Sequence, residues 1–463
     1  MRSKLFTIIG LILFGVIIIL PPIIYGYVYP NVGDDSAGHL AFFDSIKAGN
    51  PSGLRYLAYA FVGYPLVWIS NLTSTSIDTL YLWFTYGVLI LVGITIYFVV
   101  SRLVNREAGW FALWLTTFCA QGILFLFYFG QIFNLINIGI ILPLLLYFIV
   151  KYLIGKRVYQ LVLVLIFAGL FGSFHTSGIY LPIVASFATL MYVIYARDKK
   201  YKINIHGIVL GIGIVVLSAI AFVLIPEGRY LVDRMVFSII NRTLTVPLVD
   251  YLLGIVSPTL LVLLVGGAVY SKNILKNINK ETKILITILS CTIMVLAVAA
   301  FAPISPDPWR QALDLATILA LFVAVLLGLF IRQQKDKLLI IIILIVVGVG
   351  LFHNVPAWFS YNSAIRLADK QAIEFVNNLD CQTYSCSAEV APWIYNRFLK
   401  AEYIKDEGEV LIMRSTPMTP KSDKSNMWFD KHGIEMNDNY VSVIGFCDDV
   451  VWVNILLRAD LCE

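Results

Sequence analysis

Two adjacent carboxylates, Asp34 and Asp35, follow the first long apolar run of the chain. A carboxylate at the boundary of a membrane can act as a general base towards an acceptor group, or as a ligand of a metal ion. The same residues suit a solvated turn, in which Asp35 or Ser36 caps a helix that begins at Ala37. Both interpretations can hold together, because one aspartate can cap the helix while the other carries the chemistry.

Two histidines are further candidates. His39 follows Asp35 by four residues, so the two share one face if this segment is helical. His39 would then orient the carboxylate or contact a phosphate, or it is simply a structural hydrogen-bonding residue. His175 lies in the polar break 172–178 between two apolar runs, where an ionisable group is either functional or part of a polar hairpin.

Arginines stand in two of the polar loops between apolar runs, and Arg242 is one of them. Arg229 and Arg234 fall in the loop 226–249, and Arg310 falls in the loop 302–311. Arginine binds phosphate through paired donors, so each of them can hold a lipid phosphate. Arg310 is the strongest candidate, because it follows a proline-containing turn and precedes an apolar run. The alternatives are an arginine that snorkels to the membrane surface, or ion pairs with the nearby acids Glu227, Asp233 and Asp307.

The composition is that of a membrane protein. Hydrophobic residues make up 59% of the chain and charged residues 14%, whereas soluble domains carry about 25% charged residues. The apolar runs predict an all-α polytopic protein with about 11 transmembrane helices. They lie near residues 5–29, 78–100, 109–129, 132–154, 158–174, 178–196, 206–225, 250–271, 283–302, 312–331 and 337–353.

Two apolar segments need separate treatment. The first run resembles a signal peptide, but it is too long and no small-residue cleavage site follows it, so we expect an uncleaved span. The segment Tyr56–Leu72 is short for a span and contains Gly63 and Pro65. We therefore predict an interfacial or re-entrant helix there.

The basic residues predict the orientation in the membrane. Clusters of Lys and Arg follow every second span, which places the N-terminus in the cytoplasm by the positive-inside rule. The outer face then carries the loops 30–77, 226–249 and 302–311 and everything after residue 353. The net charge of +5 is small and lies in short loops, so we expect no nucleic-acid partner.

The chain changes character after residue 353. Residues 1–353 form the expected transmembrane domain, and 354–463 a small extracytoplasmic α+β domain with a helix at 363–378 and strands at 409–414, 440–446 and 450–458. An even number of cysteines in an exported domain predicts disulfides. Three pairings are possible, and a zinc site is the alternative. The four cysteines are Cys381, Cys386, Cys447 and Cys462.

Absent motifs narrow the function. The sequence contains neither a GxxxxGK[ST] loop nor an HExxH motif, which argues against an ATP-driven pump and a zinc protease. Charged residues are scarce within the apolar runs, which weighs against an ion-coupled transporter.

Taken together, the pattern resembles the GT-C superfamily of integral membrane glycosyltransferases. The segment 33–39 is similar to the acidic motif in the first outer loop of that family, and Tyr56–Leu72 to its interfacial helices. The basic turn 101–110 is similar to the second inner connection. The resemblance covers about residues 1–200 in pattern and the remainder in architecture.

The resemblance implies sugar transfer at the outer face from a polyprenyl-phosphate-linked donor, with inversion at the anomeric carbon. Asp34 or Asp35 would be the base, Arg310 with Arg229 or Arg234 would hold the lipid phosphate, and His39 or His175 would line the cavity. Some members use a divalent metal such as Mg²⁺ or Mn²⁺ near the acidic pair, and others none.

The acceptor would be a lipid, a glycan or a protein. The sequence lacks the WWDYG-like motif of oligosaccharyltransferase catalytic subunits, which argues against transfer of a whole glycan to asparagine. A flippase of lipid-linked sugars and a non-catalytic cell-envelope assembly subunit are the alternative functions.

Overall fold

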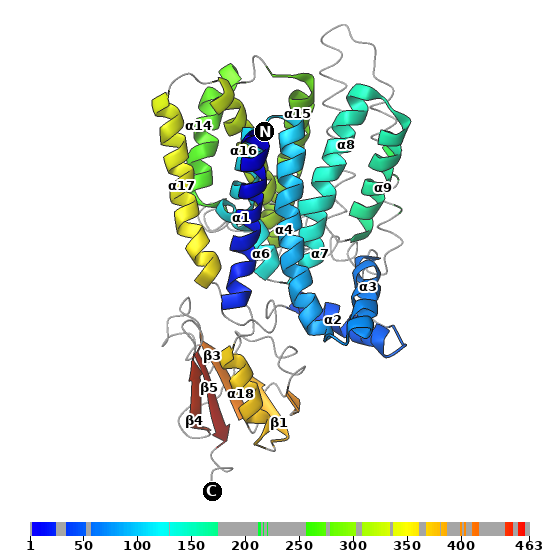
Figure 1. The fold of residues 1–463 in the computed structure, drawn as a ribbon, viewed down its shortest axis with the longest axis vertical. Helices are drawn as coiled ribbons and strands as arrows, with labels where there is room; N and C mark the ends of the chain where they lie inside the picture. Colours follow the sequence, from blue (N-terminus) through cyan, green and yellow to red (C-terminus); the bar gives the residue numbers. More distant parts are fainter. Residues whose placement is uncertain are drawn as a thin grey trace.

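The computed structural model consists of a helical bundle and a smaller sheet (Figure 1). It describes residues 2–24, 34–51, 57–128, 130–174, 256–274, 278–301, 308–333, 337–360, 367–379, 381–386, 399–400, 402–403, 410–415, 440–447 and 452–458, together with 212, 213, 216 and 220. Of the expected spans, 178–196 and most of 206–225 lie outside this part of the chain.

Within the described part, five helices are long and apolar enough to cross a membrane, and three more apolar helices are shorter. The chain is therefore a multi-pass membrane protein, as the composition predicts. The total of about 11 spans stays a prediction. The five long helical segments run over Thr7–Ile24, Ile77–Leu103, Ile132–Gly155, Lys280–Phe301 and Gln311–Gln333, and the three shorter ones over Val158–Phe174, Pro258–Gly267 and Ile340–Phe352.

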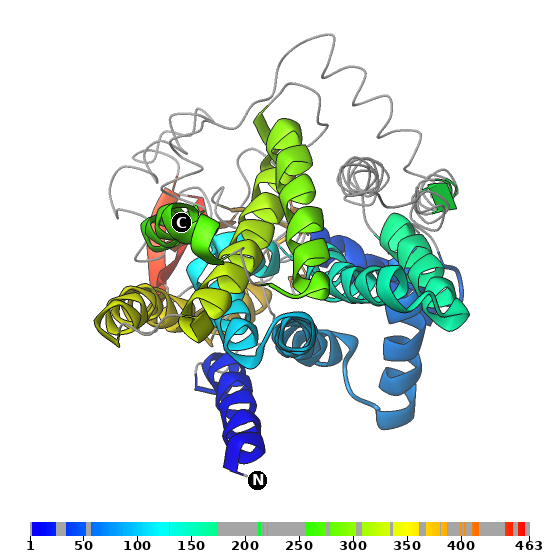
Figure 2. The same ribbon diagram turned by 90° about the horizontal axis from the view of Figure 1, so that it is seen from above.

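The long helices differ in how deeply they are packed. In α16 (Pro308–Gln333), 83% of the apolar window is buried inside the protein, whereas in α1 (Arg2–Ile24) only 22% is. Figure 2 shows α1 at the periphery of the bundle. Helix α16 is thus a central helix, around which the others pack. Its neighbours include α5 (Arg106–Trp114), α6 (Gln121–Tyr128), α14 (Pro258–Ile274) and α15 (Lys280–Phe301).

One of the expected spans is interrupted and the next contains a π-helix, and the sequence pattern predicted neither feature. The run 109–129 consists of α5, a π-helix over Leu115–Cys119 and then α6. Ala120 separates the last two with an extended backbone (φ −92°, ψ 120°). The next span consists of α7 (Ile132–Ile136), a second π-helix over Asn137–Ile141 and α8 (Leu142–Gly155). π-Helical segments inside α-helices are common near functional sites.

Short helices α2 (Asp34–Lys47) and α3 (Leu57–Thr73) lie together at one end of the bundle, which we call the α2 end (Figure 1). Gly63 allows the two helices to approach closely, because a Cβ atom there would lie 2.7 Å from the ring of Phe43. Helix α3 is not among the helices long and apolar enough to span, and its interfacial location in a bilayer stays a prediction.

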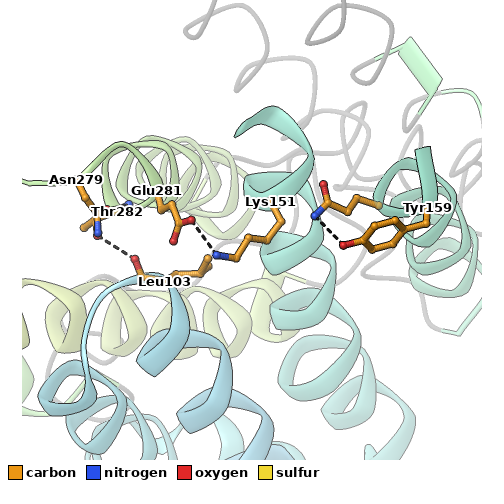
Figure 3. A network of polar contacts seen from close by, with 7 residues as sticks. Leu103, Lys151, Tyr159, Asn279, Glu281 and Thr282 are labelled. Atoms are coloured by element: carbon orange, nitrogen blue, oxygen red, sulfur yellow. Dashed lines mark hydrogen bonds and ion pairs between the residues drawn. The ribbon is translucent and has the colours of Figure 1, made fainter. Parts of the chain in front are cut away.

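Polar contacts tie the helices together at the opposite end (Figure 3). Lys151 on α8 donates to Glu281 on α15 at 2.8 Å, and the hydroxyl of Thr282 donates to the carbonyl of Leu103 on α4 (Ile77–Leu103) at 3.0 Å. These two contacts connect α8, α15 and α4 to one another. Their residues belong to the basic clusters and connections that the positive-inside rule assigns to the cytoplasm, an orientation that remains a prediction.

Asn105 joins α5 to α16 at this same end. Its Oδ1 accepts from the backbone N–H of Ala108 at 2.7 Å and so caps α5, while its Nδ2 donates to the carbonyl of Gly328 at 3.0 Å. The two helices touch at this point, because a Cβ atom on Gly328 would collide with the backbone and Cβ of Ala108. Small residues permit such close contacts between membrane helices.

The remaining described helices of the bundle are α9 (Val158–Phe174) and α17 (Lys337–Ser360). The former agrees with the predicted run 158–174, and the latter extends past the predicted run 337–353. Helix α17 leads to the part of the chain that carries the sheet.

The strands beyond residue 380 form one sheet in the order β2-β1-β3-β5-β4. Helix α18 (Leu367–Asn377) lies against β4 and β5. Strand β1 is parallel to β2 and β3, and β5 is antiparallel to β3 and β4. Strands β3, β4 and β5 were predicted from sequence, whereas β1 and β2 were not. The strands run over Thr383–Cys386, Glu402–Tyr403, Val410–Ser415, Tyr440–Cys447 and Trp452–Arg458 in chain order.

The sheet limits how the four cysteines can pair. Cys386 ends β1 and Cys447 ends β4, and two other strands separate β1 from β4. Three strand spacings amount to about 14 Å, whereas Cα atoms joined by a disulfide lie at most about 7 Å apart. A bond between Cys386 and Cys447 is therefore excluded. Cys381 lies two residues before β1, at the end of the sheet away from Cys447, so a bond between these two is excluded as well. One of the three pairings, Cys381 with Cys386 and Cys447 with Cys462, remains as a prediction, and Cys462 lies outside the described residues.

Candidate active site

The predicted acidic motif stands in the first turn of α2. The helix begins at Asp34, three residues earlier than expected, so the prediction that Asp35 or Ser36 caps a helix starting at Ala37 is wrong. A helix can start there because acidic residues in the first turn interact favourably with the helix dipole. The structure describes the backbone of Asp34 and Asp35 but not their side chains.

The apolar face of α2 fixes the helix on the bundle. Leu40 and Phe43 have no exposed surface, and Ile46 is partly buried against the same core. These residues follow one another at intervals of three, which places them on one side of the helix. The burial of this apolar face fixes α2, and with it the first turn that contains the two aspartates, against the bundle.

His39 is buried in an aromatic cage, with only 3% of its surface exposed. Its Nδ1 atom shares a hydrogen bond of 2.7 Å with the hydroxyl of Tyr81 on α4. The ring of Phe133 lies 4.2 Å from the imidazole ring, and the ring of Tyr59 on α3 stands edge-on at 4.9 Å. Because α2 is helical from Asp34 to Lys47, His39 lies one turn after Asp35, as the spacing predicts.

A buried carboxylate lies close to this cage. Asp314 on α16 has no exposed surface, and its Oδ1 accepts a hydrogen bond of 3.2 Å from Nδ2 of Asn134, which is equally buried. Gln311, one turn before Asp314, is also buried, and no described residue pairs with its Oε1 atom. Ionisable groups within membrane segments are costly and are usually functional.

Helix α7 connects the two groups of residues. Phe133 contacts His39 of α2, while its neighbour Asn134 contacts Asp314 of α16. Helices α2 and α16 therefore contact two consecutive residues of α7. This brings the first turn of α2 and the first half of α16 to the same end of the bundle.

Arg310 lies in the first turn of α16, four residues before Asp314 and on the same face of the helix. The structure describes its backbone position but not its side chain. The backbone thus places the strongest of the predicted phosphate-binding arginines at the α2 end. The other candidates, His175, Arg229 and Arg234, lie outside the described residues.

Sequence reasoning missed Asp314, Asn134 and Tyr81. A signal for Asp314 was present, because it is the sole charged residue in the predicted span 312–331. Nothing in the local sequence distinguishes Tyr81 or Asn134. Their roles depend on contacts between helices that lie 42 and 180 residues apart along the chain.

The described residues contain no group of three or more His, Cys, Asp or Glu side chains that could hold a metal ion. Asp34 and Asp35 offer adjacent carboxylates, which are the oxygen ligands that Mg²⁺ and Mn²⁺ prefer. Their residue types fit such an ion, and any further ligand would come from a substrate, water or another part of the chain.

Comparison with known proteins finds similarity in structure alone. No family model matches the sequence, and no curated protein matches it either. The apo oligosaccharyltransferase of Archaeoglobus fulgidus superposes with a TM-score of 0.57 at 10% identity, covering 85% of this chain and 64% of that one. The same enzyme, AglB, in complex with an inhibitory peptide and a dolichol-phosphate gives a TM-score of 0.55 at 11% identity, covering 86% and 65%.

A third structure of the A. fulgidus enzyme, in complex with Zn and sulfate, has a TM-score of 0.54 at 12% identity and covers 97% of this chain and 75% of that one. This chain spans slightly less than two thirds of the first two structures. At such low identity the similarity concerns the fold. The protein shares the fold of this archaeal membrane oligosaccharyltransferase, in agreement with the fold that the resemblance to the GT-C superfamily implies.

Proposed function

We propose that the protein is an inverting glycosyltransferase, which transfers a sugar from a polyprenyl-phosphate-linked donor to an acceptor at the outer face of the membrane. One observation carries the proposal. Helix α7 draws the first turn of α2, with its two aspartates, and the start of α16, with Arg310, to the same end of a GT-C fold. A base and a phosphate-binding cation are the two groups that this reaction needs.

In the proposed reaction, an acceptor hydroxyl or amide attacks the anomeric carbon of the donor sugar. The bond from that carbon to the phosphate oxygen breaks, and the electron pair leaves with the polyprenyl phosphate. Asp34 or Asp35 accepts the proton from the acceptor. Single displacement on the face opposite the phosphate inverts the configuration at the anomeric carbon.

The leaving phosphate gains negative charge as the bond breaks, so a fixed cation beside it lowers the barrier. We assign this role to Arg310, assisted by Arg229 or Arg234. A guanidinium group suits it because its paired N–H donors match two phosphate oxygens. His39 and His175 would line the cavity, His39 from within its aromatic cage.

A divalent ion such as Mg²⁺ or Mn²⁺ would bind at Asp34 or Asp35 if the enzyme uses one, and it would neutralise charge on the leaving phosphate. A related fold has been determined with Zn and sulfate, in the A. fulgidus enzyme. If this protein binds such an ion, one of the two aspartates would hold it and the other would remain available as the base.

The donor is proposed to be lipid-linked, which agrees with the dolichol-phosphate present in one AglB structure. Another AglB structure carries an acceptor peptide with the NVT sequon. This chain lacks the WWDYG-like motif of oligosaccharyltransferases. We therefore favour a single sugar as the transferred group, with a lipid, a glycan or a protein as acceptor.

The proposed site requires the α2 end to face outward. The basic clusters support this orientation, with a cytoplasmic N-terminus. Figure 1 shows the sheet beyond the α2 end of the bundle. An extracytoplasmic α+β domain over 354–463, with disulfides among its cysteines, is consistent with that arrangement and would lie over the site.

The experiment that tests the proposal is a turnover assay with purified full-length protein and radiolabelled polyprenyl-phosphate sugars. Wild type is compared with Asp34→Asn and Asp35→Asn, and with Asp44→Asn as a matched control on the same helix. Loss of the general base should reduce turnover by about 100-fold or more in one of the first two variants. Donor binding and the Asp44→Asn variant should be nearly unaffected.

Equal turnover in all four proteins would contradict the assigned roles of Asp34 and Asp35. If donor binds to wild type but no sugar is transferred or hydrolysed, vesicle assays would distinguish a flippase from an assembly subunit. A flippase would move the lipid-linked sugar between leaflets, whereas an assembly subunit would not.

A further inference from the structure

Helix α7 is the first part of the continuous helical segment Ile132–Gly155. It comprises five residues, Ile132–Ile136, between Gly130 with a positive φ of 72° and the π-helix that begins at Asn137. The end of a helix frays unless contacts with the rest of the protein fix it. Two consecutive residues of α7 provide such contacts in two directions.

The first contact anchors α7 on the central helix of the bundle. Asn134 donates to Asp314 across 3.2 Å, and neither residue has any exposed surface. A buried carboxylate without hydrogen bonds is strongly unfavourable, so this contact is specific as well as stabilising. The anchor is rigid, because α16 is the most deeply packed of the long helices.

The second contact joins α7 to α2, so the position of α7 determines the surroundings of His39. Phe133 lies against the imidazole of His39, with ring centroids 4.2 Å apart, and also against Tyr59 at 5.0 Å. Phe133 has only 1% of its surface exposed. A displacement of α7 would therefore open the cage around His39, one helical turn from Asp35.

We infer that Asn134 and Asp314 are positioning residues for the active site. Their hydrogen bond holds α7 so that Phe133 keeps His39 enclosed and the first turn of α2 in its catalytic orientation. This inference rests on the proposed function for its catalytic consequence. Its structural consequence, protection of His39, is independent of the reaction.

The test measures the chemical accessibility of His39 in the full-length protein in nanodiscs. Diethyl pyrocarbonate acylates accessible imidazoles, and mass spectrometry separates His39 from the other four histidines. We expect His39 in Asn134→Ala to react about tenfold faster than in wild type, because loss of one buried hydrogen bond favours the open state.

A matched control separates positioning from general destabilisation. Asn105→Ala also removes a buried side-chain hydrogen bond to α16, but at the opposite end of that helix. It should leave the rate at His39 unchanged. The exchanged pair Asn134→Asp with Asp314→Asn restores one amide and one carboxylate, and we expect it to recover most of the protection of His39.

Turnover provides the second readout. Asn134→Ala should lower kcat at least about tenfold with little change in KM for the donor, and the exchanged pair should recover part of kcat. Unchanged reactivity of His39 in Asn134→Ala, or an equal rise in Asn105→Ala, would overturn the inference. If wild type shows no transfer, the proposed function fails, while the His39 result still decides whether the pair encloses that residue.

Discussion

Replacement of Gly328 by alanine should loosen the contact between α5 and α16. A Cβ atom at this position would collide with the Cβ, Cα and backbone nitrogen of Ala108. These atoms belong to the helix itself, so no side-chain rotation can relieve the clash. The two helices must move apart, which also lengthens the hydrogen bond from Asn105 to the carbonyl of Gly328.

The expected magnitude follows from two opposing effects. Alanine is favoured over glycine in a helix by about 1 kcal/mol, whereas overpacking of a tight contact costs about 1–3 kcal/mol. Since the colliding atoms are mainly backbone, we place the overpacking cost in the upper part of that range. The net loss in free energy of unfolding should be about 1–2 kcal/mol.

Gly348 on α17 provides the matched control, because a Cβ atom there would meet nothing within 4 Å. Gly348→Ala should keep the helix-propensity gain and raise stability by up to about 1 kcal/mol. The assay is reversible unfolding in mixed micelles, with helicity followed by circular dichroism. The opposite signs of the two substitutions are the essential result.

Ala108→Gly should only partly rescue Gly328→Ala, since it removes the Cβ but not the backbone atoms of residue 108. If Gly328→Ala and Gly348→Ala shift stability in the same direction by the same amount, α5 and α16 do not make this contact. The described packing of α16 against α5 would then be wrong.

Three further predictions concern other parts of the molecule. Tyr81→Phe removes the hydroxyl that bonds Nδ1 of His39 and should lower unfolding free energy by about 1–2 kcal/mol, measured in the same micelle assay; no loss would show that the bond is not formed. Lys151→Met breaks the partly exposed ion pair with Glu281 and should lower the unfolding free energy by at most about 1 kcal/mol, and by less at high salt; a loss independent of salt would argue against an ion pair. Mass-spectrometric mapping of disulfides should find no bond between Cys386 and Cys447, and detection of that bond would contradict the strand order.

Much of the membrane body could be predicted from the sequence, because hydrophobic length alone identifies a spanning helix. The ends of α9 agree with the predicted run to the residue, and α4 and α15 agree closely. The two π-helices and the break at Ala120 could not be predicted, since most of their residues are as apolar as those of a regular α-helical span. The first π-helix packs against α16 and α17, and the second packs against α4 and α9.

In the candidate site, too, some residues could be predicted from the sequence and others could not. The acidic pair and His39 stand out because polar residues are rare beside an apolar run. The partners of His39 do not, because Tyr81 and Phe133 look like ordinary apolar or aromatic residues of a span. Strands β1 and β2 were missed for a related reason: they are four and two residues long, too short to show an alternating pattern.

The measurement that tests the central claim most directly is transfer of labelled sugar from a polyprenyl-phosphate donor by wild type, Asp34→Asn, Asp35→Asn and Asp44→Asn. The account predicts turnover in wild type and in the Asp44 variant, and a loss of about 100-fold or more in one of the other two while donor binding persists. Turnover that survives both substitutions, alone and combined, would contradict the assignment of the catalytic base to the first turn of α2.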